Sequence, residues 1–435
     1  MASMTESELG RVLLTHRGVQ WIIGTKDDPY ALLLRAASDD PHRLGDLIRE
    51  RGPLYWSSAE AWVTARHEVA AAALADPRLS FRHPDADAPA ADDDAGEQRE
   101  PMPWEVPALR EILPFGELFL TAGRADCKRV RELLEPLLGA EALERWRPAA
   151  EQALRAALAA AGTEFDLRSD IADGFAAGLV REILGVPEED HDRFAALVRG
   201  GAGALDAMVC SPHLRTAHEL ITSVDGMGAL LGDLIARRRE QPGDDPVSAL
   251  LAAAPEHEVR SVCTLVALVG SELAANVLCA AVAALLDHPE VWRSLCENPG
   301  LAPAVVEETL RYAPPVRLVP LYAHEDLELA GTAVPAGSQV VVALEAALRD
   351  TAVGTEPAVF DPAAERSGRQ PDLPVLPVFS GELPVTLLAP LVRLLAESGL
   401  RALSAEAPGV RRTGPVLRRL RSAVTGAVLE LPLTR

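Results

Sequence analysis

Aromatic residues and lysine are both scarce in this sequence. Phe, Trp and Tyr make up 4% of its 435 residues, although 48% of all residues are hydrophobic. Aliphatic and alanine side chains must therefore fill the core. Only Lys26 and Lys128 are lysines, and 42 basic against 64 acidic residues give a formal net charge of −22. This acidity argues against nucleic acid and anionic membranes as partners, because both carry negative charge themselves.

Cysteines are few, scattered and odd in number. None lies in a Cys-x-x-Cys pair or in a Cys/His spacing typical of metal sites. We expect reduced, mostly buried thiols in a cytoplasmic protein, since disulfides are rare in that compartment. The opening MASMTESELG has no basic segment followed by an apolar one, so we expect no signal peptide. The five positions are Cys127, Cys210, Cys263, Cys279 and Cys296.

One stretch, residues 258–287, is long and apolar nearly all round. Its length would suit a membrane span. Glu272 and Asn276 near its middle, together with many small residues, favour a helix buried inside the protein instead.

The remaining pattern predicts many helices and a few short strands. A turn at 27–29 precedes an apolar helix, 54–66 reads as a β-hairpin and 67–74 as a helix. We expect further helices at 124–139, 141–161, 170–185, 188–200 and 213–240, and strands at 327–329 and 334–344. These elements predict a mostly α fold with small β-sheets (α+β). At 435 residues the chain is long for one average domain.

Residues 83–107 differ in composition from their surroundings. They are acidic, proline-rich and almost without apolar residues until Met102 and Trp104. Because such a segment cannot bury enough surface to offset its ordering entropy, we expect a flexible acidic loop at 84–100.

The most informative stretch runs from 287 to 322 and is centred on Glu308 and Arg311. Pro303 suits the first turn of a helix and two prolines at 314–315 end it. Glu307 and Glu308 lie four and three residues before Arg311, so either can pair with it. An isolated Glu-x-x-Arg would be an ordinary helical ion pair.

Here the flanks agree as well. A helix beginning DHPE, a short linker and then VEETLRYAPPV resemble the K-helix region of bacterial cytochromes P450. The order of hairpin, central apolar helix and K-helix is similar to that family throughout. The resemblance implies a cytochrome P450 fold, with Glu308 and Arg311 as structural residues. The single domain over 1–435 that we expect is also what the resemblance of residues 287–322 implies.

Several positions depart from what the resemblance implies. In the helix at 124–139, Cys127 stands where the family has a propionate-binding His, while Arg131 keeps the matching Arg or is a solvated helix residue. In the central helix, Glu272 keeps the acid but Leu273 replaces the Thr of the oxygen-activating pair. Leucine cannot relay a proton.

Two further arginines of the family pattern are also replaced. Leu321 stands where an Arg binds a propionate, and Val359 stands where an Arg completes the Glu-Arg-Arg core. The region that should carry the thiolate ligand of iron, 365–386, contains no cysteine, and Phe379 begins what remains of the loop. We expect a P450 scaffold with no haem or other cofactor, no metal and no catalytic residues.

This combination resembles the P450-like auxiliary proteins of antibiotic-pathway glycosyltransferases, over nearly the whole chain. That resemblance implies a non-catalytic partner that stabilises and activates a transferase of TDP-deoxyaminosugars in a hetero-oligomer, with self-dimerisation left open. Two alternatives stay open. One is a small-molecule binding module that takes an aglycone or sugar in the emptied haem cavity, and the other is a haem monooxygenase.

Possible interface anchors are the Trp-Ile-Ile segment at 21–23 and the pair Met102 and Trp104, since aromatics and Met are favoured at interfaces. We expect Trp21 to pack into the protein's own core. Arg418, Arg419 and Arg421 near the C-terminus fit either a phosphate site or, as we prefer, a basic hairpin edge.

Overall fold

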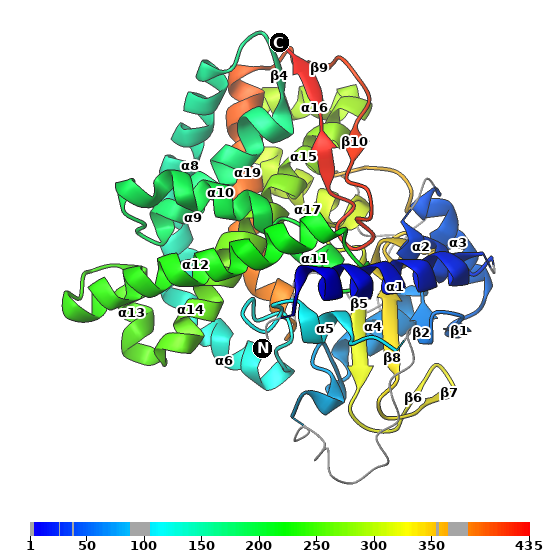
Figure 1. The fold of residues 1–435 in the computed structure, drawn as a ribbon. Coiled ribbons are helices and arrows are strands. Elements are labelled where there is room, and N and C mark those ends of the chain that lie inside the picture. Colours follow the sequence, from blue (N-terminus) through cyan, green and yellow to red (C-terminus); the bar gives the residue numbers. More distant parts are fainter. Residues whose placement is uncertain (1–3, 26, 37–38, 88–104, 354–355, 364–381) are drawn as a thin grey trace.

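The computed structural model describes residues 4–25, 27–36, 39–87, 105–353, 356–363 and 382–435. Within these ranges the chain is mostly α-helical with small sheets, as predicted from the sequence. Helices fill the left of Figure 1 and the largest sheet lies at the lower right. Buried apolar side chains from Leu9 to Leu433 form one connected core. The single domain over 1–435 stays a prediction.

The largest sheet joins two distant parts of the sequence. Its strand order is β1-β2-β8-β5-β3. The predicted hairpin supplies β1 and β2, which pair antiparallel, and β2 then runs parallel to β8. The sequence analysis missed β5. The bounds are β1 (Tyr55–Ser57), β2 (Ala61–Thr64), β3 (Leu79–Ser80), β5 (Leu318–Ala323) and β8 (Gln339–Ala343).

The core helix is the apolar stretch noted in the sequence. It consists of α14 (Glu256–Leu265), the π-helical segment η4 (Val266–Gly270) and α15 (Ser271–Asp287). Its apolar length would be enough to cross a membrane, but the whole of its most apolar window is buried inside the protein. The prediction of a buried helix is confirmed, because neighbouring helices cover the apolar surface on all sides.

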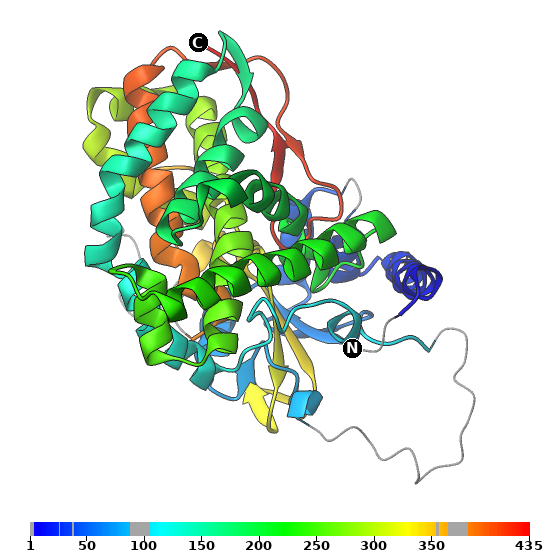
Figure 2. The same cartoon turned by 60° about the vertical axis from the view of Figure 1, so that its left-hand side comes forward.

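Helices packed around this core carry most of the structure (Figure 2). The long ones largely match the predicted ranges. They are α8 (Ala140–Ala160), α9 (Asp173–Ile183), preceded by the π-helical η2 (Leu167–Ala172), α10 (His191–Gly201), α12 (Leu214–Glu240), α16 (Pro289–Glu297), α17 (Ala302–Tyr312) and α19 (Ala389–Glu406).

One predicted helix is broken in the structure. The range 124–139 forms two helices, α6 (Arg124–Leu133) and α7 (Glu135–Leu138). Pro136 lacks the N–H needed to continue the α6 hydrogen-bond ladder, which accounts for the break. The acidic loop predicted at 84–100 begins with a 3-10 turn, η1 (Pro84–Asp87). Its remainder lies outside the described residues, as do Met102 and Trp104.

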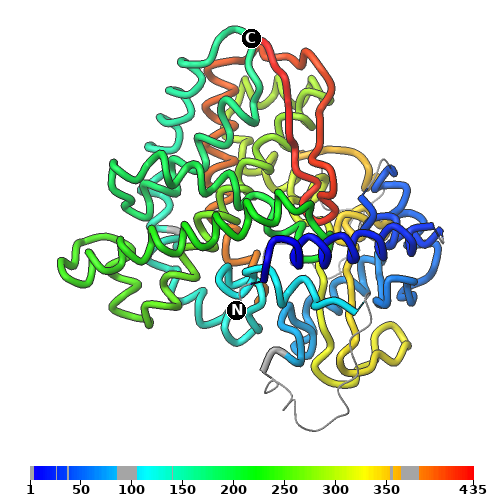
Figure 3. Tube along the Cα trace, viewed as in Figure 1, coloured from blue at the N-terminus to red at the C-terminus, as the bar shows by residue number. Residues whose placement is uncertain are grey.

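The tip of the C-terminal hairpin lies beside the first helices, although the two termini are far apart (Figure 1). Figure 3 shows the C-terminal hairpin approaching the first helices, α1 (Glu6–Gly24), α2 (Pro29–Arg35) and α3 (Pro41–Glu50). The hairpin is formed by β10 (Leu417–Arg418) and β11 (Val428–Glu430).

The other short elements complete the chain. The helices are α4 (His67–Ala75), α5 (Leu109–Ile112), α11 (Ala204–Ala207), α13 (Pro246–Ala253), α18 (Leu344–Ala347) and η8 (Pro384–Leu388), and the strands are β4 (Glu164–Asp166), β6 (Leu327–Leu329), β7 (Thr332–Val334), β9 (Arg411–Arg412) and β12 (Pro432–Thr434).

Candidate functional site

Glu308 and Arg311 form a bidentate ion pair on α17. Arg311 Nε lies 2.8 Å from one carboxylate oxygen of Glu308, and Nη2 lies 2.6 Å from the other. Both side chains are largely buried, at 9% and 18% exposure. Sequence reasoning left Glu307 and Glu308 open as partners. The structure selects Glu308, because Glu307 faces α19 and pairs with Arg393 instead.

Backbone groups complete this network where the family would place a third charge. The carbonyls of Pro357 and Val359 each accept a hydrogen bond of 2.7 Å from Arg311. The N–H of Asp361 donates to Glu308 at 2.9 Å. The Val359 side chain is 44% exposed and takes no part. The pair therefore ties α17 to the segment 357–361 without a second arginine.

Glu272 lies in the middle of a buried charge network. Its carboxylate accepts hydrogen bonds from Arg168 at the start of η2 and, at 3.0 Å, from Nη2 of Arg419 in the hairpin. Arg168 also pairs with Asp173 at 2.6 Å. Burial opposes the charge on Arg168, but Glu272 and Asp173 keep its pKa above the usual value.

This network gives Glu272 a structural role that sequence reasoning missed. Its carboxylate is held by two guanidinium groups from distant parts of the chain, and Leu273 beside it is completely buried. Nothing local to α15 indicates the arginine partners, which lie about a hundred and a hundred and fifty residues away. Arg419 is thus an inward-pointing anchor and not an edge residue, which corrects that part of our interpretation.

Asp206 on α11 is a second buried anchor for the hairpin. Its carboxylate accepts hydrogen bonds from the N–H groups of Val424 and Thr425 at 3.0 and 2.9 Å. The hydroxyls of Thr425 and Ser422 donate to it at 2.7 and 2.8 Å. These four bonds, together with the Arg419–Glu272 pair, fix the tip of the C-terminal hairpin against the helices.

Thr386 lies where the family resemblance would place a thiolate ligand. In the family pattern the ligand follows the loop Phe by seven positions, and Phe379 plus seven is 386. The Thr386 hydroxyl accepts a hydrogen bond of 3.0 Å from Nη2 of Arg131 and donates to the Leu383 carbonyl at 2.7 Å. Arg131, which the resemblance assigns to a haem propionate, therefore contacts the residue at the ligand position.

The neighbouring groups are equally unlike a haem site. Cys127 is fully buried, and burial raises the pKa of its thiol to about 12. Leu321 is buried in β5. Gly270 faces α19 and the turn before it, where an added Cβ would lie 3.1 Å from Leu391 and 3.4 Å from Leu388. The described residues at these positions do not fit a thiolate-ligated haem.

The remaining candidates from the sequence are also placed. Trp21 is 58% exposed, so the expectation that it packs into the core is wrong. Its ring lies under the guanidinium of Arg35, with the Cζ atom 5.1 Å from the ring centroid. α1 buries its opposite face, so its tryptophan is left toward solvent. Four of the five cysteines are buried and all are free thiols, as expected.

The described part of the chain contains no group of three or more His, Cys, Asp or Glu side chains able to hold a metal ion.

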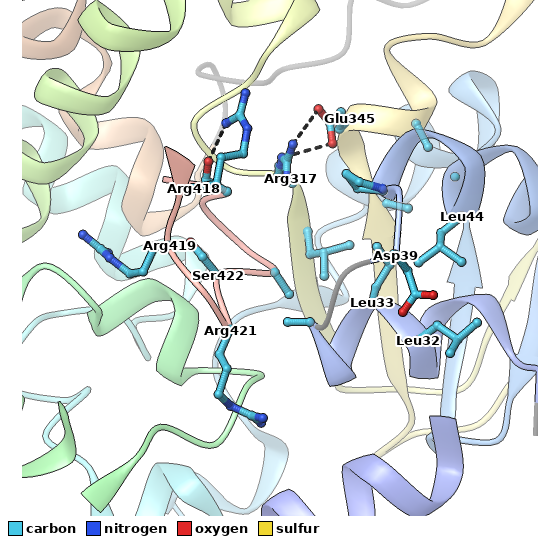
Figure 4. A pocket seen from close by; sticks show the side chains of 18 of the residues that line it. Leu32, Leu33, Asp39, Leu44, Arg317, Glu345, Arg418, Arg419, Arg421 and Ser422 are labelled. Atoms are coloured by element: carbon cyan, nitrogen blue, oxygen red, sulfur yellow. Dashed lines mark hydrogen bonds and ion pairs between the residues drawn. The ribbon is translucent and has the colours of Figure 1, made fainter. Parts of the chain in front are cut away.

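A cavity of about 200 Å³ lies between α2, α3 and the tip of the C-terminal hairpin, and Figure 4 shows the side chains around it. Arg317 and Glu345 form an ion pair at its rim.

The fold and the Glu308–Arg311 site define a cytochrome P450 scaffold, and comparison with known proteins agrees. The family model for cytochrome P450 matches residues 252–364. The solved structure of P450BioI in complex with an acyl carrier protein ligated to hexadec-9Z-enoic acid superposes with a TM-score of 0.76. It is 28% identical, and the match covers 91% of this chain and 98% of that one.

Curated relatives extend over nearly the whole chain. Protein AknT of Streptomyces galilaeus is 44% identical, covering 99% of this chain and 96% of that protein. Protein DesVIII of Streptomyces venezuelae is 34% identical, covering 99% and 95%. Nocardicin C N-oxygenase of Nocardia uniformis is 31% identical, covering 89% and 92%. The chain belongs to the cytochrome P450 family.

We predict that Glu308→Ala strongly destabilises the protein. Removing one member of a buried pair leaves the other uncompensated, at a cost of about 3–5 kcal/mol. Thermal and chemical unfolding measure the loss. Glu307→Ala, one position away in a half-exposed pair, is the control and should cost about 0–1 kcal/mol. Equal unfolding midpoints for the two variants would contradict a structural role for Glu308.

We also predict that Glu272→Ala loosens the C-terminal hairpin. Arg168 would lose its buried partner, and Arg419 would lose the pair that anchors the tip, so the free energy of unfolding should fall by about 3–5 kcal/mol. Amide hydrogen exchange should accelerate at 422–428. Asp287→Ala, which removes a more exposed pair with Arg412, should leave that segment protected. Unchanged exchange in Glu272→Ala would show that the network does not hold the hairpin.

Proposed function

We propose that this protein is a non-catalytic partner of a glycosyltransferase that moves a TDP-deoxyaminosugar in antibiotic biosynthesis. It binds the transferase in the cytoplasm and holds it in its active form. The observation that carries this proposal is that the P450 scaffold is kept while the groups for P450 chemistry are replaced. Arg131 bonded to Thr386 at the ligand position is the clearest instance.

The names of the relatives also support a non-catalytic role. The two at 44% and 34% identity are named only as proteins, whereas the relative named as an oxygenase is 31% identical. Resemblance to the auxiliary proteins also extends to both ends of the chain, outside the segment that the family model matches. A protein that keeps the size of the P450 scaffold without the groups for P450 chemistry would act through its surface.

The physical mechanism is linkage. A protein that binds the active form of a transferase more tightly than its inactive or unfolded forms shifts the population toward the active form. At a concentration one hundred times the dissociation constant, such binding stabilises the partner by about 2.7 kcal/mol. No catalytic group on this chain is required.

A small-molecule binding module is the second candidate. The sequence analysis placed its ligand in an emptied haem cavity. The cavity of about 200 Å³ that has both apolar and cationic walls lies elsewhere, between α2, α3 and the hairpin tip. Calorimetry with the aglycone and with the TDP-sugar, in the absence of a transferase, separates the two. Binding of either compound together with no effect on the transferase would favour the module.

We predict that the protein binds no haem, since Thr386 cannot replace a thiolate and Arg131 is already engaged there. Protein purified from cells supplied with a haem precursor should show no Soret band near stoichiometry. A reduced carbon monoxide complex with the absorbance of thiolate-ligated iron would contradict this and favour a monooxygenase.

Co-expression with the glycosyltransferase encoded beside this protein should raise that enzyme's soluble yield, melting temperature and turnover. Turnover is compared with and without this protein at matched concentrations, alongside co-elution in gel filtration. Equal turnover and separate elution would overturn the proposed function.

A further inference from the structure

The first helix exposes apolar side chains along one face, where the guanidinium of Arg35 lies over the Trp21 ring. Leu14, Trp21 and Ile22 are 63%, 58% and 62% exposed. Their spacing of seven and eight residues, with Gly18 between them, places them on one side of α1. A Cβ on Gly18 would meet nothing within 4 Å, so the middle of this face is open. The buried side of the same helix includes Leu13.

The tip of the C-terminal hairpin contacts α1. Nη2 of Arg421 donates to Oε1 of Gln20 at 2.9 Å, which fixes the tip beside α1. Leu420, the neighbour of Arg421, is 79% exposed. It also lines the cavity between the hairpin and α2–α3, together with Leu33. The exposed Leu420 therefore lies on the segment that contacts α1.

Arginines without acidic partners border these apolar groups. Arg17 donates to the Pro212 carbonyl at 2.6 Å and Arg421 donates to the Ser211 carbonyl at 3.0 Å. Arg418 donates to the Gly426 carbonyl at 2.6 Å. Among the described carboxylates, none forms an ion pair with these three guanidiniums, although the chain has 64 acidic residues against 42 basic ones.

The local electrostatics reflect this lack of compensation. Burial and the charge of Arg421 lower the pKa of Arg17. Burial, followed by the charges of Arg17 and Arg421, also lowers the pKa of His213. Desolvation and the nearby Arg317 lower the pKa of Arg418 to about 10, against an opposing effect of the Glu345 carboxylate. A carboxylate brought to this surface would relieve the repulsion between these cations.

We propose that this surface is where the glycosyltransferase docks, through a segment that presents apolar side chains flanked by carboxylates. We call it the α1–hairpin surface, and define it by Leu14, Arg17, Trp21, Ile22, Leu420 and Arg421. The inference rests on the proposed function and adds the location and chemistry of the contact. Exposed tryptophan beside arginine is the combination enriched among residues that dominate binding energy.

A protein segment fits this surface better than a small anion does. From Leu14 to Ile22 the exposed stripe runs eight residues, or about 12 Å along α1. None of Leu14, Trp21 and Ile22 lines the cavity. A phosphate held by the arginines would leave this stripe in water, whereas a docked segment would cover the stripe and meet the cations together.

The test compares matched double variants. Trp21→Ala with Leu420→Ala removes the apolar anchors from both ends of the surface. Trp56→Ala with Leu301→Ala is the control, since these side chains are 51% and 37% exposed on β1 and beside α17. Affinity for the purified glycosyltransferase encoded beside this protein is measured by surface plasmon resonance. We expect at least about a tenfold loss for the first variant and none for the control.

A second pair of variants tests the charges. Arg17→Gln should slow association with the transferase and flatten its dependence on salt, because the cation steers an acidic partner. Arg239→Gln is the control. Arg17 bonds to Pro212, just before the N-terminal end of α12, whereas Arg239 lies at the C-terminal end of α12 and is already paired with Glu256. Melting temperatures of all four variants should stay close to that of the unaltered protein.

The outcomes separate this inference from the proposed function. If the unaltered protein neither binds nor stimulates the transferase, the proposed function falls and the docking surface falls with it. If the unaltered protein binds and stimulates but the α1–hairpin variants do so equally well, only the docking surface is overturned. Binding of inorganic phosphate at the arginines, with transferase affinity unchanged in Arg17→Gln, would also overturn it in favour of a small-anion site.

Discussion

The structure depends on how the charge of Glu272 is compensated inside the core helix. Every residue from Ser271 to Leu285 is buried, and a carboxylate there is costly unless it is paired. Arg168 and Arg419 supply the pairing from opposite directions. The core helix, the η2 segment before α9 and the C-terminal hairpin are thereby joined at Glu272. The tip of the same hairpin contacts α1 through Arg421 and Gln20.

Aliphatic contacts surround the core helix near its π-helical segment. Leu388 and Leu391 approach Gly270, and Arg131 donates a hydrogen bond to Thr386. Closely packed contacts of this kind contribute dispersion and hydrophobic energy. The Glu308–Arg311 network remains because its partners are backbone groups of the neighbouring segment.

Motif and periodicity predicted most of the long helices, the first hairpin and the two glutamates that could pair with Arg311, because each depends on residues close in sequence. Strand β5 was missed, since the prolines at 314–315 and 320 mask its alternation. The partners of Glu272 and Asp206 could not be predicted, because they come from 104 to 219 positions away. Exposure of Trp21 was equally hidden, as it depends on which face of α1 the rest of the protein covers.

Two buried carboxylates hold the tip of the C-terminal hairpin in place. Burying Asp206 and Glu272 costs desolvation energy, and both carboxylates accept hydrogen bonds from this one short segment. Residues 422–428 of that tip are buried in the core, whereas Leu420 beside them is 79% exposed. The buried part of the tip therefore holds an exposed apolar side chain on a rigid support. A partner benefits when that side chain is already ordered, because ordering it on binding would subtract from the affinity.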